Sequence, residues 1–494
     1  MSQRESSQEL LPIADLALPL DAQPPRSRRI YCNRNLRLDL IEWVGFDMDY
    51  TLAIYDQDAM DRLSIDATAR KLVERGYPRE LLDMGFPTHF PIRGLLVDKK
   101  LGNIIKTDRY RYAKKAFHGT HEMPSEQRKR TYAARRVRPG TKRYHSIDTL
   151  YALSEVVVYA AAVDTLDARG ERPDYATLFE DVRAAIDEAH RDGTIKGQII
   201  ADPERYVERD PDLPATLHKL RSSGKKLFLL TNSEAEYTDA MMRHLIDETT
   251  AEYGSWRSYF DVVICEAQKP RFFTEVAPFV DAEDATAPVD RLARGRLYRG
   301  GNLSDFQRMA QVRSDRVLYV GDHIFGDVLR AKKDSAWRTL MIIQEMTDEL
   351  DAMERFAPDI ERLHRLETRR YNLLDGLRDR LTLLKTLDRK LDEGRFAAGE
   401  RVEVEAARLR LRRAVDRVRT QIKAVHNEYE ELESQLEHAY HPYWGSPFKA
   451  ESELSSFGEQ VERYACLYSD RVTNLLRYSA NHYFIGPRHR MAHE

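Results

Sequence analysis

The sequence has little of what marks secreted, membrane-spanning or disulfide-rich proteins. Only three of its 494 residues are cysteine, which is too few for a disulfide framework. The longest apolar run, Val156 to Val163, has eight residues, whereas a membrane span needs roughly 18 or more. The polar stretch from Met1 to Glu9 lacks an apolar signal core. We therefore expect a cytoplasmic protein with no membrane partner.

A large net charge is also lacking. The chain carries 78 basic and 81 acidic residues, a formal net charge of −3. Such a chain creates no global field that attracts polyanions, so we expect no nucleic-acid partner. Hydrophobic residues make up 42% and aromatic residues 9%, as in ordinary globular proteins. The length allows roughly two to four domains.

Two aspartates follow the first clear strand of the chain. The apolar run from Trp43 to Phe46 predicts a buried strand, and Asp47, Asp49 and Thr51 come directly after it. Ligands of an open parallel sheet bind outside the carboxyl ends of its strands, so a nucleophile, a metal ligand and an acid can share this loop. An Asx-rich turn without chemistry is the alternative.

Three more predicted strands end in polar side chains. The group after the second strand fits either a turn with a helix cap or a cradle for phosphate oxygens. A glycine after the fourth strand allows a ligand or backbone to approach closely. Together the four strand ends offer complementary chemistry. The side chains are Thr231, Asn232 and Ser233 after the second strand, Lys269 after the third, and Asp322 and Asp327 after the fourth.

This combination resembles the motifs of the haloacid-dehalogenase (HAD) superfamily of phosphotransferases. Phe46 to Leu52 (Phe-Asp-Met-Asp-Tyr-Thr-Leu) and Gly321 to Asp327 (Gly-Asp-His-Ile-Phe-Gly-Asp) resemble the signatures of the cytosolic purine 5′-nucleotidase family, which cleaves inosine and guanosine monophosphates. The likeness continues through Phe179 to Lys196, and it spans Ile30 to the end of the chain. It implies an α/β fold: a Rossmann-like HAD core with a parallel sheet and a large cap inserted between the first two motifs.

The chain divides into an arm, a core, an inserted cap and a C-terminal helical region. Helical patterns occur in the cap around 66–76 and 175–192. The expected parts are a flexible N-terminal arm at 1–29, the catalytic core at 30–52 and 225–345, the cap at 53–224, and the C-terminal helical region at 346–494.

The C-terminal region contains apolar residues at alternating four-three spacing from Leu411 to Leu436 and an earlier stripe from Leu377 to Leu391. Two glycines lie between the stripes, which predicts an antiparallel helical hairpin over residues 373–438. The hairpin either packs on its own core or makes an intersubunit contact. The family's oligomeric habit implies a homo-oligomer, a dimer or a tetramer.

The residue types indicate how the site would act. An aspartate has an unperturbed pKa of about 3.9, so we expect Asp47 to be an ionised nucleophile that needs no base. The phosphate substrate is also an anion, and each unit-charge pair opposes approach by about 4 kcal/mol at about 4 Å and an effective dielectric of about 20. Mg²⁺ would offset this repulsion, with Asp47, Asp322 and the main-chain carbonyl of Asp49 as ligands.

The other core residues have supporting roles. Lys269 would place a positive charge on the phosphoryl oxygens, and Thr231 and Asn232 would donate hydrogen bonds to them. We expect Asp327 to orient Lys269 or metal-bound water rather than to bind the metal, and His323 to be structural. By resemblance, Asp49 protonates the leaving oxygen and then takes a proton from water.

Substrate selection is assigned to the cap. Arg183, Asp187 and His190 share one face of a predicted helix, a pattern that by itself fits a surface ion pair beside a helix-ending histidine. The resemblance implies instead that Arg183, Asp187 and Lys196 contact nucleoside and phosphate, with Tyr151 stacking on the base. His190 and Ser233 complete the expected substrate site.

A basic stretch runs from Lys106 to Arg143, with thirteen Lys or Arg against three Asp or Glu. It is a solvated face, a polyphosphate effector site or an RNA-binding patch. By resemblance, Arg138 contacts activating purine triphosphates, and Phe325 and Lys333 belong to the same site. Asp148 stands where animal members have Asn, so we expect a purine nucleotide effector site of altered or weakened preference.

The sequence therefore predicts a Mg²⁺-dependent hydrolase of purine nucleoside 5′-monophosphates that acts through a phosphoaspartate and can also transfer phosphate to a nucleoside. A HAD phosphatase for another small phosphate ester is the enzymatic alternative. A nucleotide-binding scaffold whose hairpin recruits partners is the non-enzymatic one, and the four intact motifs argue against it.

Overall fold

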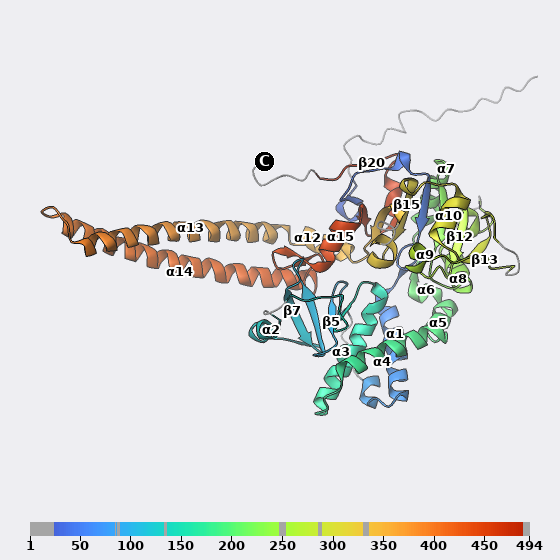
Figure 1. Ribbon diagram of the computed structural model, residues 1–494, viewed down its shortest axis with the longest axis horizontal. Helices are drawn as coiled ribbons and strands as arrows, with labels where there is room; N and C mark the ends of the chain where they lie inside the picture. The colour runs from blue at the N-terminus through green and yellow to red at the C-terminus, as the bar shows by residue number, and fades with distance from the viewer. Residues whose placement is uncertain are drawn as a thin grey trace, which may run out of the picture.

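A nine-stranded sheet forms the core of the protein (Figure 1). The computed structural model describes residues 24–487, apart from 84, 86–88, 133–135, 247–252, 285–288 and 330–334. The strand order is β1-β19-β16-β15-β3-β11-β12-β14-β13, and the seven inner strands are parallel. Their bounds are β19 Leu467–Ser469, β16 Arg338–Ile342, β15 Val317–Gly321, β3 Trp43–Phe46, β11 Lys226–Leu230, β12 Val262–Cys265 and β14 Leu297–Gly300; the antiparallel edges are β1 Tyr31–Cys32 and β13 Phe279–Asp281.

Both faces of the sheet are covered, so its central strands are apolar throughout. On β11, Leu227 and Leu229 face the hydrophobic cluster that includes α7 (Asp212–Ser222) and α8 (Ala235–Ile246). Phe228 packs on the other side with α10 (Leu303–Ala310). A Cβ atom on Gly45 of β3 would lie 2.1 Å from Cζ of Phe228, so only glycine fits there. This α/β architecture confirms the expected fold class.

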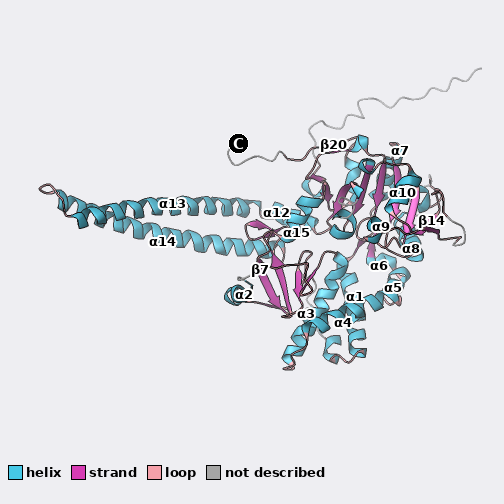
Figure 2. Cartoon of the chain, viewed as in Figure 1, coloured by secondary structure: helices cyan, strands magenta, loops and turns pink. Residues whose placement is uncertain are grey.

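The insertion after β3 contains helices and a second, smaller sheet, separate from the core sheet in Figure 2. The first helix begins at Gln57, well before residue 66, because Asp56 caps it by accepting a hydrogen bond from the Ala59 amide. The helix expected at 175–192 is α4, and Gly193 follows with a φ of +81°. The elements are α1 Gln57–Glu74, α3 Leu153–Ala168 and α4 Tyr175–Arg191, with β5 Leu96–Asp98, β6 Asn103–Thr107, β7 Ala113–His118, β8 His121–Glu122, β9 Tyr144–Ser146 and α2 Ser125–Tyr132.

The basic stretch is built into this smaller sheet and is not simply a solvated face. Lys106 on β6 is buried, and its Nζ donates to the carbonyl oxygens of Trp444 and Ser446 at 2.5 and 2.7 Å. Arg143 forms two hydrogen bonds to the buried carboxylate of Asp98, at 2.8 and 2.6 Å. Both ends of the stretch therefore have structural partners.

Two long helices, α13 (Ala357–Glu393) and α14 (Glu400–Tyr440), pair antiparallel and project from the rest of the molecule (Figure 1). The hairpin is longer than the expected 373–438, because α13 continues almost directly from α12 (Met346–Arg355) and starts with Pro358 in its first turn, where proline is tolerated. Most of the apolar α14 residues at four-three spacing are buried: Val415, Val418, Val425, Tyr429, Leu432 and Leu436.

The chain returns to the core after the hairpin, which differs from the expected helical region at 346–494. Helix α15 (Ser456–Tyr464) leads into β19, which pairs with β16 in the main sheet. With three residues, β19 is too short to reveal an alternating pattern in the sequence. At the other end, residues 1–23 of the expected arm lie outside the described residues, and Arg26–Arg28 form a short 3₁₀ helix. Over the described part of the chain, no helix combines the length and apolar character of a membrane crossing.

Candidate active site

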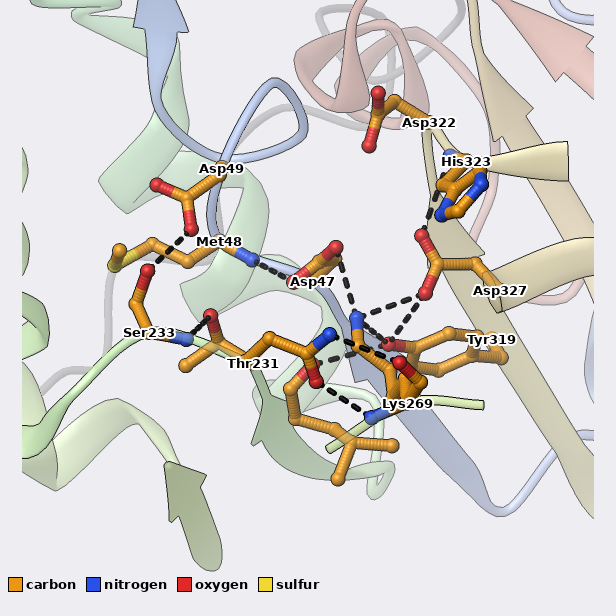
Figure 3. A network of polar contacts seen from close by, with 12 residues as sticks. Asp47, Met48, Asp49, Thr231, Ser233, Lys269, Tyr319, Asp322, His323 and Asp327 are labelled. Atoms are coloured by element: carbon orange, nitrogen blue, oxygen red, sulfur yellow. Dashed lines mark hydrogen bonds and ion pairs between the residues drawn. The ribbon is translucent and has the colours of Figure 1, made fainter. Parts of the chain in front are cut away.

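The carboxyl ends of β3, β11, β12 and β15 meet at one edge of the core sheet and bring the predicted core residues together (Figure 3). Because β3 lies between β11 and β15, the chain reverses its winding direction there, which is where ligands of such sheets bind. The residues are Asp47 and Asp49 after β3, Thr231, Asn232 and Ser233 after β11, Lys269 after β12, and Asp322 and Asp327 after β15.

Lys269 is fixed between two carboxylates. Its Nζ lies 2.8 Å from Oδ2 of Asp47 and 2.8 Å from Oδ1 of Asp327, and it donates to the hydroxyl of Tyr319 at 3.0 Å. Asn232 holds the Lys269 backbone by accepting from its amide at 2.6 Å and donating to its carbonyl at 3.1 Å. Although burial opposes the ammonium charge, Asp327 and Asp47 raise the pKa of Lys269 well above its usual range. The lysine is therefore a permanent cation.

The two aspartates after β3 have different surroundings. Asp47 accepts a hydrogen bond from the Met48 amide at 2.8 Å and faces the ammonium. Asp49 accepts from the hydroxyl of Tyr55 at 2.6 Å and from Oγ of Ser233 at 2.7 Å. Figure 3 shows the Asp49 carboxylate on the Ser233 side, turned away from the ammonium. The two side chains, although identical, therefore lie in different surroundings.

Carboxylates outnumber the ammonium in this cluster. Oxygen atoms of Asp47, Asp322 and Asp327 all lie within 4.8 Å of one another, and all three residues are buried. Burial raises the pKa of Asp322 to about 7 against the opposing charge of Arg93. Such an all-oxygen donor set fits a divalent cation of the Mg²⁺ type, which would neutralise the surplus charge.

The expectation that Asp47 is ionised without help needs correction. Burial raises the pKa of Asp47 well above its ordinary range, against the opposing charge of Lys269, and the like charges of Asp327 and Asp322 raise it further. The ordinary pKa of about 3.9 belongs to a solvated aspartate and does not apply to one in a buried cluster. Ionisation of Asp47 therefore depends on positive charge beside it.

Sequence reasoning missed a buried arginine. Arg93 comes from the insertion, and its side chain is 0% exposed. Its Nη1 donates to the main-chain oxygen of Asp322 at 2.8 Å, and its Nε and Nη2 donate to the Glu345 carboxylate at 2.6 Å each. A signal was present, since Arg93 is the one charge in the apolar run from Phe90 to Val97, and a buried arginine needs carboxylate partners.

Two tyrosines that were also missed stand behind Asp49. The hydroxyls of Tyr55 and Tyr237 lie 2.9 Å apart, and Tyr55 continues to Asp49. Lys196, at the start of α5 (Lys196–Ala201), forms an ion pair with Glu234 and lies over the Tyr237 ring, 5.4 Å from its centre. The expected phosphate contact from the cap is therefore close to the loop after β11.

Tyr151 and His190 are also brought together. The Tyr151 hydroxyl is hydrogen-bonded to Nδ1 of His190, and the ring centres are 4.3 Å apart. Burial, assisted by Lys196, lowers the pKa of His190 to about 4, so its ring is neutral at physiological pH. On the same helix, Nε of Arg183 lies 3.7 Å from Oε2 of Glu155, and Asp187 is exposed.

Arg138 lines a separate cavity of about 910 Å³ in the basic stretch. Of the other residues expected there, Lys333 and the side chain of Phe325 lie outside the described residues. His323 donates its main-chain amide to Oδ2 of Asp327 at 3.2 Å, a contact that does not involve its side chain. The other arginines of the cavity are Arg109, Arg111, Arg136 and Arg143.

Comparison with known proteins identifies the family of the chain. The model of the 5′ nucleotidase family matches residues 30–494. A 5′-nucleotidase domain-containing protein 2 from Homo sapiens is 30% identical over 486 residues, which cover 94% of this chain and 85% of that protein. Its counterpart from Rattus norvegicus is 29% identical over 485 residues, covering 94% and 80%.

A 5′-nucleotidase domain-containing protein from Dictyostelium discoideum is 28% identical over 484 residues, which cover 94% of this chain and 74% of that protein. The family match covers the four motifs, the insertion and the C-terminal return to the core sheet. The family resemblance read from the sequence is thereby confirmed. The chain belongs to the 5′ nucleotidase family and is an enzyme of that family.

Proposed function

We propose that the protein hydrolyses purine nucleoside 5′-monophosphates, of the inosine and guanosine type, in a Mg²⁺-dependent reaction that passes through a phosphoaspartate. The carrying observation is the difference between the contacts of Asp47 and Asp49, one beside a buried ammonium and the other held by two hydroxyl groups. Asp47, Asp322 and the main-chain carbonyl of Asp49 would hold the Mg²⁺. When bound, this ion supplies positive charge against which an anionic phosphate can approach.

In the first step a carboxylate oxygen of Asp47 attacks the phosphorus atom. The bond from phosphorus to the ribose O5′ breaks, and Asp49 gives its proton to that leaving oxygen. Lys269 stabilises negative charge on the phosphoryl oxygens, and Thr231 and Asn232 donate hydrogen bonds to them. This step releases the nucleoside and leaves the phosphoryl group on Asp47.

In the second step Asp49 takes a proton from a water molecule, whose oxygen attacks the phosphorus. The bond between phosphorus and Asp47 breaks, inorganic phosphate leaves, and both aspartates regain their starting states. A nucleoside hydroxyl in the place of water would accept the phosphoryl group, and we include this transfer in the proposal. Asp49 accepts a hydrogen bond from the hydroxyl of Tyr55, and this contact supports a role of the Asp49 carboxyl in proton transfer.

The cap is proposed to select the nucleotide. Lys196, paired with Glu234 just after the β11 loop, is within reach of that loop and would contact the substrate phosphate with Arg183. Tyr151 and neutral His190 offer two rings for a purine base. Asp187 is proposed to contact the nucleoside, and Ser233 completes the substrate site.

Phosphate release from a panel of nucleoside 5′-monophosphates and sugar phosphates, with and without Mg²⁺, tests the proposal. We expect release from inosine and guanosine monophosphates that needs Mg²⁺ and is lost in Asp47→Asn. Faster release from a sugar phosphate would favour a phosphatase for another small ester. No release from any compound by the folded protein would favour a nucleotide-binding scaffold.

We also propose that the cavity around Arg138 binds a purine nucleotide effector. Five arginines line it, and arginine is well suited to polyphosphate. Asp148 has cationic neighbours in Arg93 and Arg111, which oppose the rise that burial causes in its pKa, to about 7. ATP, GTP and diadenosine polyphosphates should change turnover or half-saturation at fixed free Mg²⁺. If none of these nucleotides changes turnover or half-saturation, the cavity is not an effector site.

Our third proposal is that the chain forms a homo-oligomer, either a dimer or a tetramer. Val402 and Leu409 lie one heptad apart on α14, and they are 70% and 52% exposed. These two exposed apolar side chains would be buried by contact with a second copy of the chain. Sedimentation equilibrium should give an oligomer that Val402→Glu with Leu409→Glu dissociates. A monomeric unsubstituted chain would contradict the proposal, and an oligomer unaffected by the substitutions would exclude this surface.

A further inference from the structure

Arg93 links the insertion to the catalytic edge of the core. The residue lies just before β5 of the smaller sheet, yet its guanidinium contacts the residue after β15 and Glu345 at the start of α12. Its position is fixed by packing as well, since its Cζ lies 5.2 Å from the centre of the Phe457 ring. All of the polar contacts described for Arg93 are to the core.

The contacts of Arg93 fix one residue in particular. Nη1 donates to the main-chain oxygen of Asp322 at 2.8 Å and lies 3.8 Å from its Oδ2. The fork formed by Nε and Nη2 is occupied by Glu345. The planar guanidinium can make all these contacts at once, whereas a lysine ammonium in the same place could not match the fork. The backbone and carboxylate of Asp322 are therefore both oriented by one side chain.

Arg93 is one of two cations that lie among the carboxylates at this edge of the core. The carboxylates are Asp47, Asp322, Asp327 and Glu345, and the cations are Lys269 and Arg93.

We infer that Arg93 is a positioning residue of the cation site, which holds Asp322 in its ligating orientation. The inference rests on the proposed function, because it takes Asp322 to be a ligand of that cation. It makes the insertion a structural part of the catalytic centre, in addition to its role toward the substrate. Residues that orient metal ligands typically contribute about 10- to 100-fold to metal affinity.

The decisive variant combines Arg93→Met with Glu345→Met. It removes one positive and one negative charge, so the cluster keeps its net charge and loses only the orienting contacts. Apolar replacement of a complete buried ion pair often preserves stability. Mn²⁺ binding, followed by electron paramagnetic resonance on protein whose thermal unfolding has been checked, should weaken at least about tenfold.

A matched pair supplies the control. Arg362 and Glu428 form a 2.6 Å ion pair between α13 and α14 of the projecting hairpin, and replacing both by Met should leave Mn²⁺ binding unchanged. Arg93→Lys keeps the charge but not the fork, and it should also bind Mn²⁺ more weakly than the unsubstituted chain. This second variant tests the same inference if the double variant does not fold.

The outcomes separate the inference from the proposed function. If the folded double variant or Arg93→Lys binds Mn²⁺ as tightly as the unsubstituted chain, Arg93 only anchors the insertion and the inference is overturned. If the unsubstituted chain binds no Mn²⁺, the proposed cation site itself is wrong and the inference falls with it. Weakening that is confined to the two Arg93 variants supports the inference.

Discussion

Gly321→Ala tests the coupling between the end of β15 and Lys269. A Cβ atom at this position would lie 2.5 Å from Oδ2 of Asp327 and 2.7 Å from its Cβ and Cγ. Carbon atoms in contact prefer about 3.5 to 4.0 Å, so the Asp327 side chain must move by about 1 Å. Its other oxygen pairs with the Lys269 ammonium at 2.8 Å, and this contact would be lost or lengthened.

The size of the effect follows from these contacts. A hydrogen bond to a charged group contributes about 1.5 to 3 kcal/mol, and misplacing a catalytic group by about 1 Å can cost about 100-fold in rate. We therefore expect kcat/KM to fall about 100-fold, which corresponds to about 2.7 kcal/mol of transition-state stabilisation. The free energy of unfolding should fall by about 1 to 3 kcal/mol, as in other overpacked interiors.

The measurement is steady-state phosphate release together with thermal unfolding. Gly254→Ala is the control, since no atom of the described residues lies within 4 Å of a Cβ placed there and the φ of Gly254 is not in the left-handed region. It should leave both quantities unchanged. If folded Gly321→Ala keeps kcat/KM within about threefold of the unsubstituted protein, the reaction does not need Asp327 in its present position. The proposed coupling between the end of β15 and Lys269 is then wrong.

Three further predictions concern single aspartates. Asp47→Asn should abolish turnover without unfolding the protein, because the amide is not nucleophilic; a folded variant with near-normal phosphate release would exclude the covalent mechanism. Asp49→Asn should lower kcat by about 10² to 10⁴, and unchanged turnover would leave only its backbone in the mechanism. Asp61 on α1 is buried, and burial raises its pKa to about 7. Its unfolded-state pKa is about 3.9, so between these values the folded state holds a proton that the unfolded state has lost, and stability falls as pH rises. Asp61→Asn cannot ionise, so its melting temperature relative to the unsubstituted protein should rise from about pH 5 to about pH 8; a constant difference would show that Asp61 is not protonated in the folded state.

The site residues that the sequence revealed are those carried by local patterns. An apolar run followed by Asp47 and Asp49 marks a strand end wherever it occurs, and the same holds for Lys269 and Asp322. Parallel strands bring such ends to one edge, so local patterns were enough to predict that these side chains meet.

The features that escaped prediction depend on contacts between distant parts of the chain. Arg93 and Glu345 are 252 residues apart, and no periodicity links the insertion to α12. Tyr55 and Tyr237 are 182 residues apart, and their pairing follows from the way the insertion folds back on the core. The raised pKa of Asp47 likewise comes from burial among residues of other strands.

The projecting hairpin changes how the protein moves through a solvent. Helix α13 has 37 residues, and at 1.5 Å per residue it is about 55 Å long. A compact chain of 494 residues would have a radius of gyration of about 23 Å. An arm more than twice that radius raises the frictional coefficient and brings the protein off a size-exclusion column early. A monomer would elute like a larger globular particle, so elution volume alone would count an assembly where one chain is present.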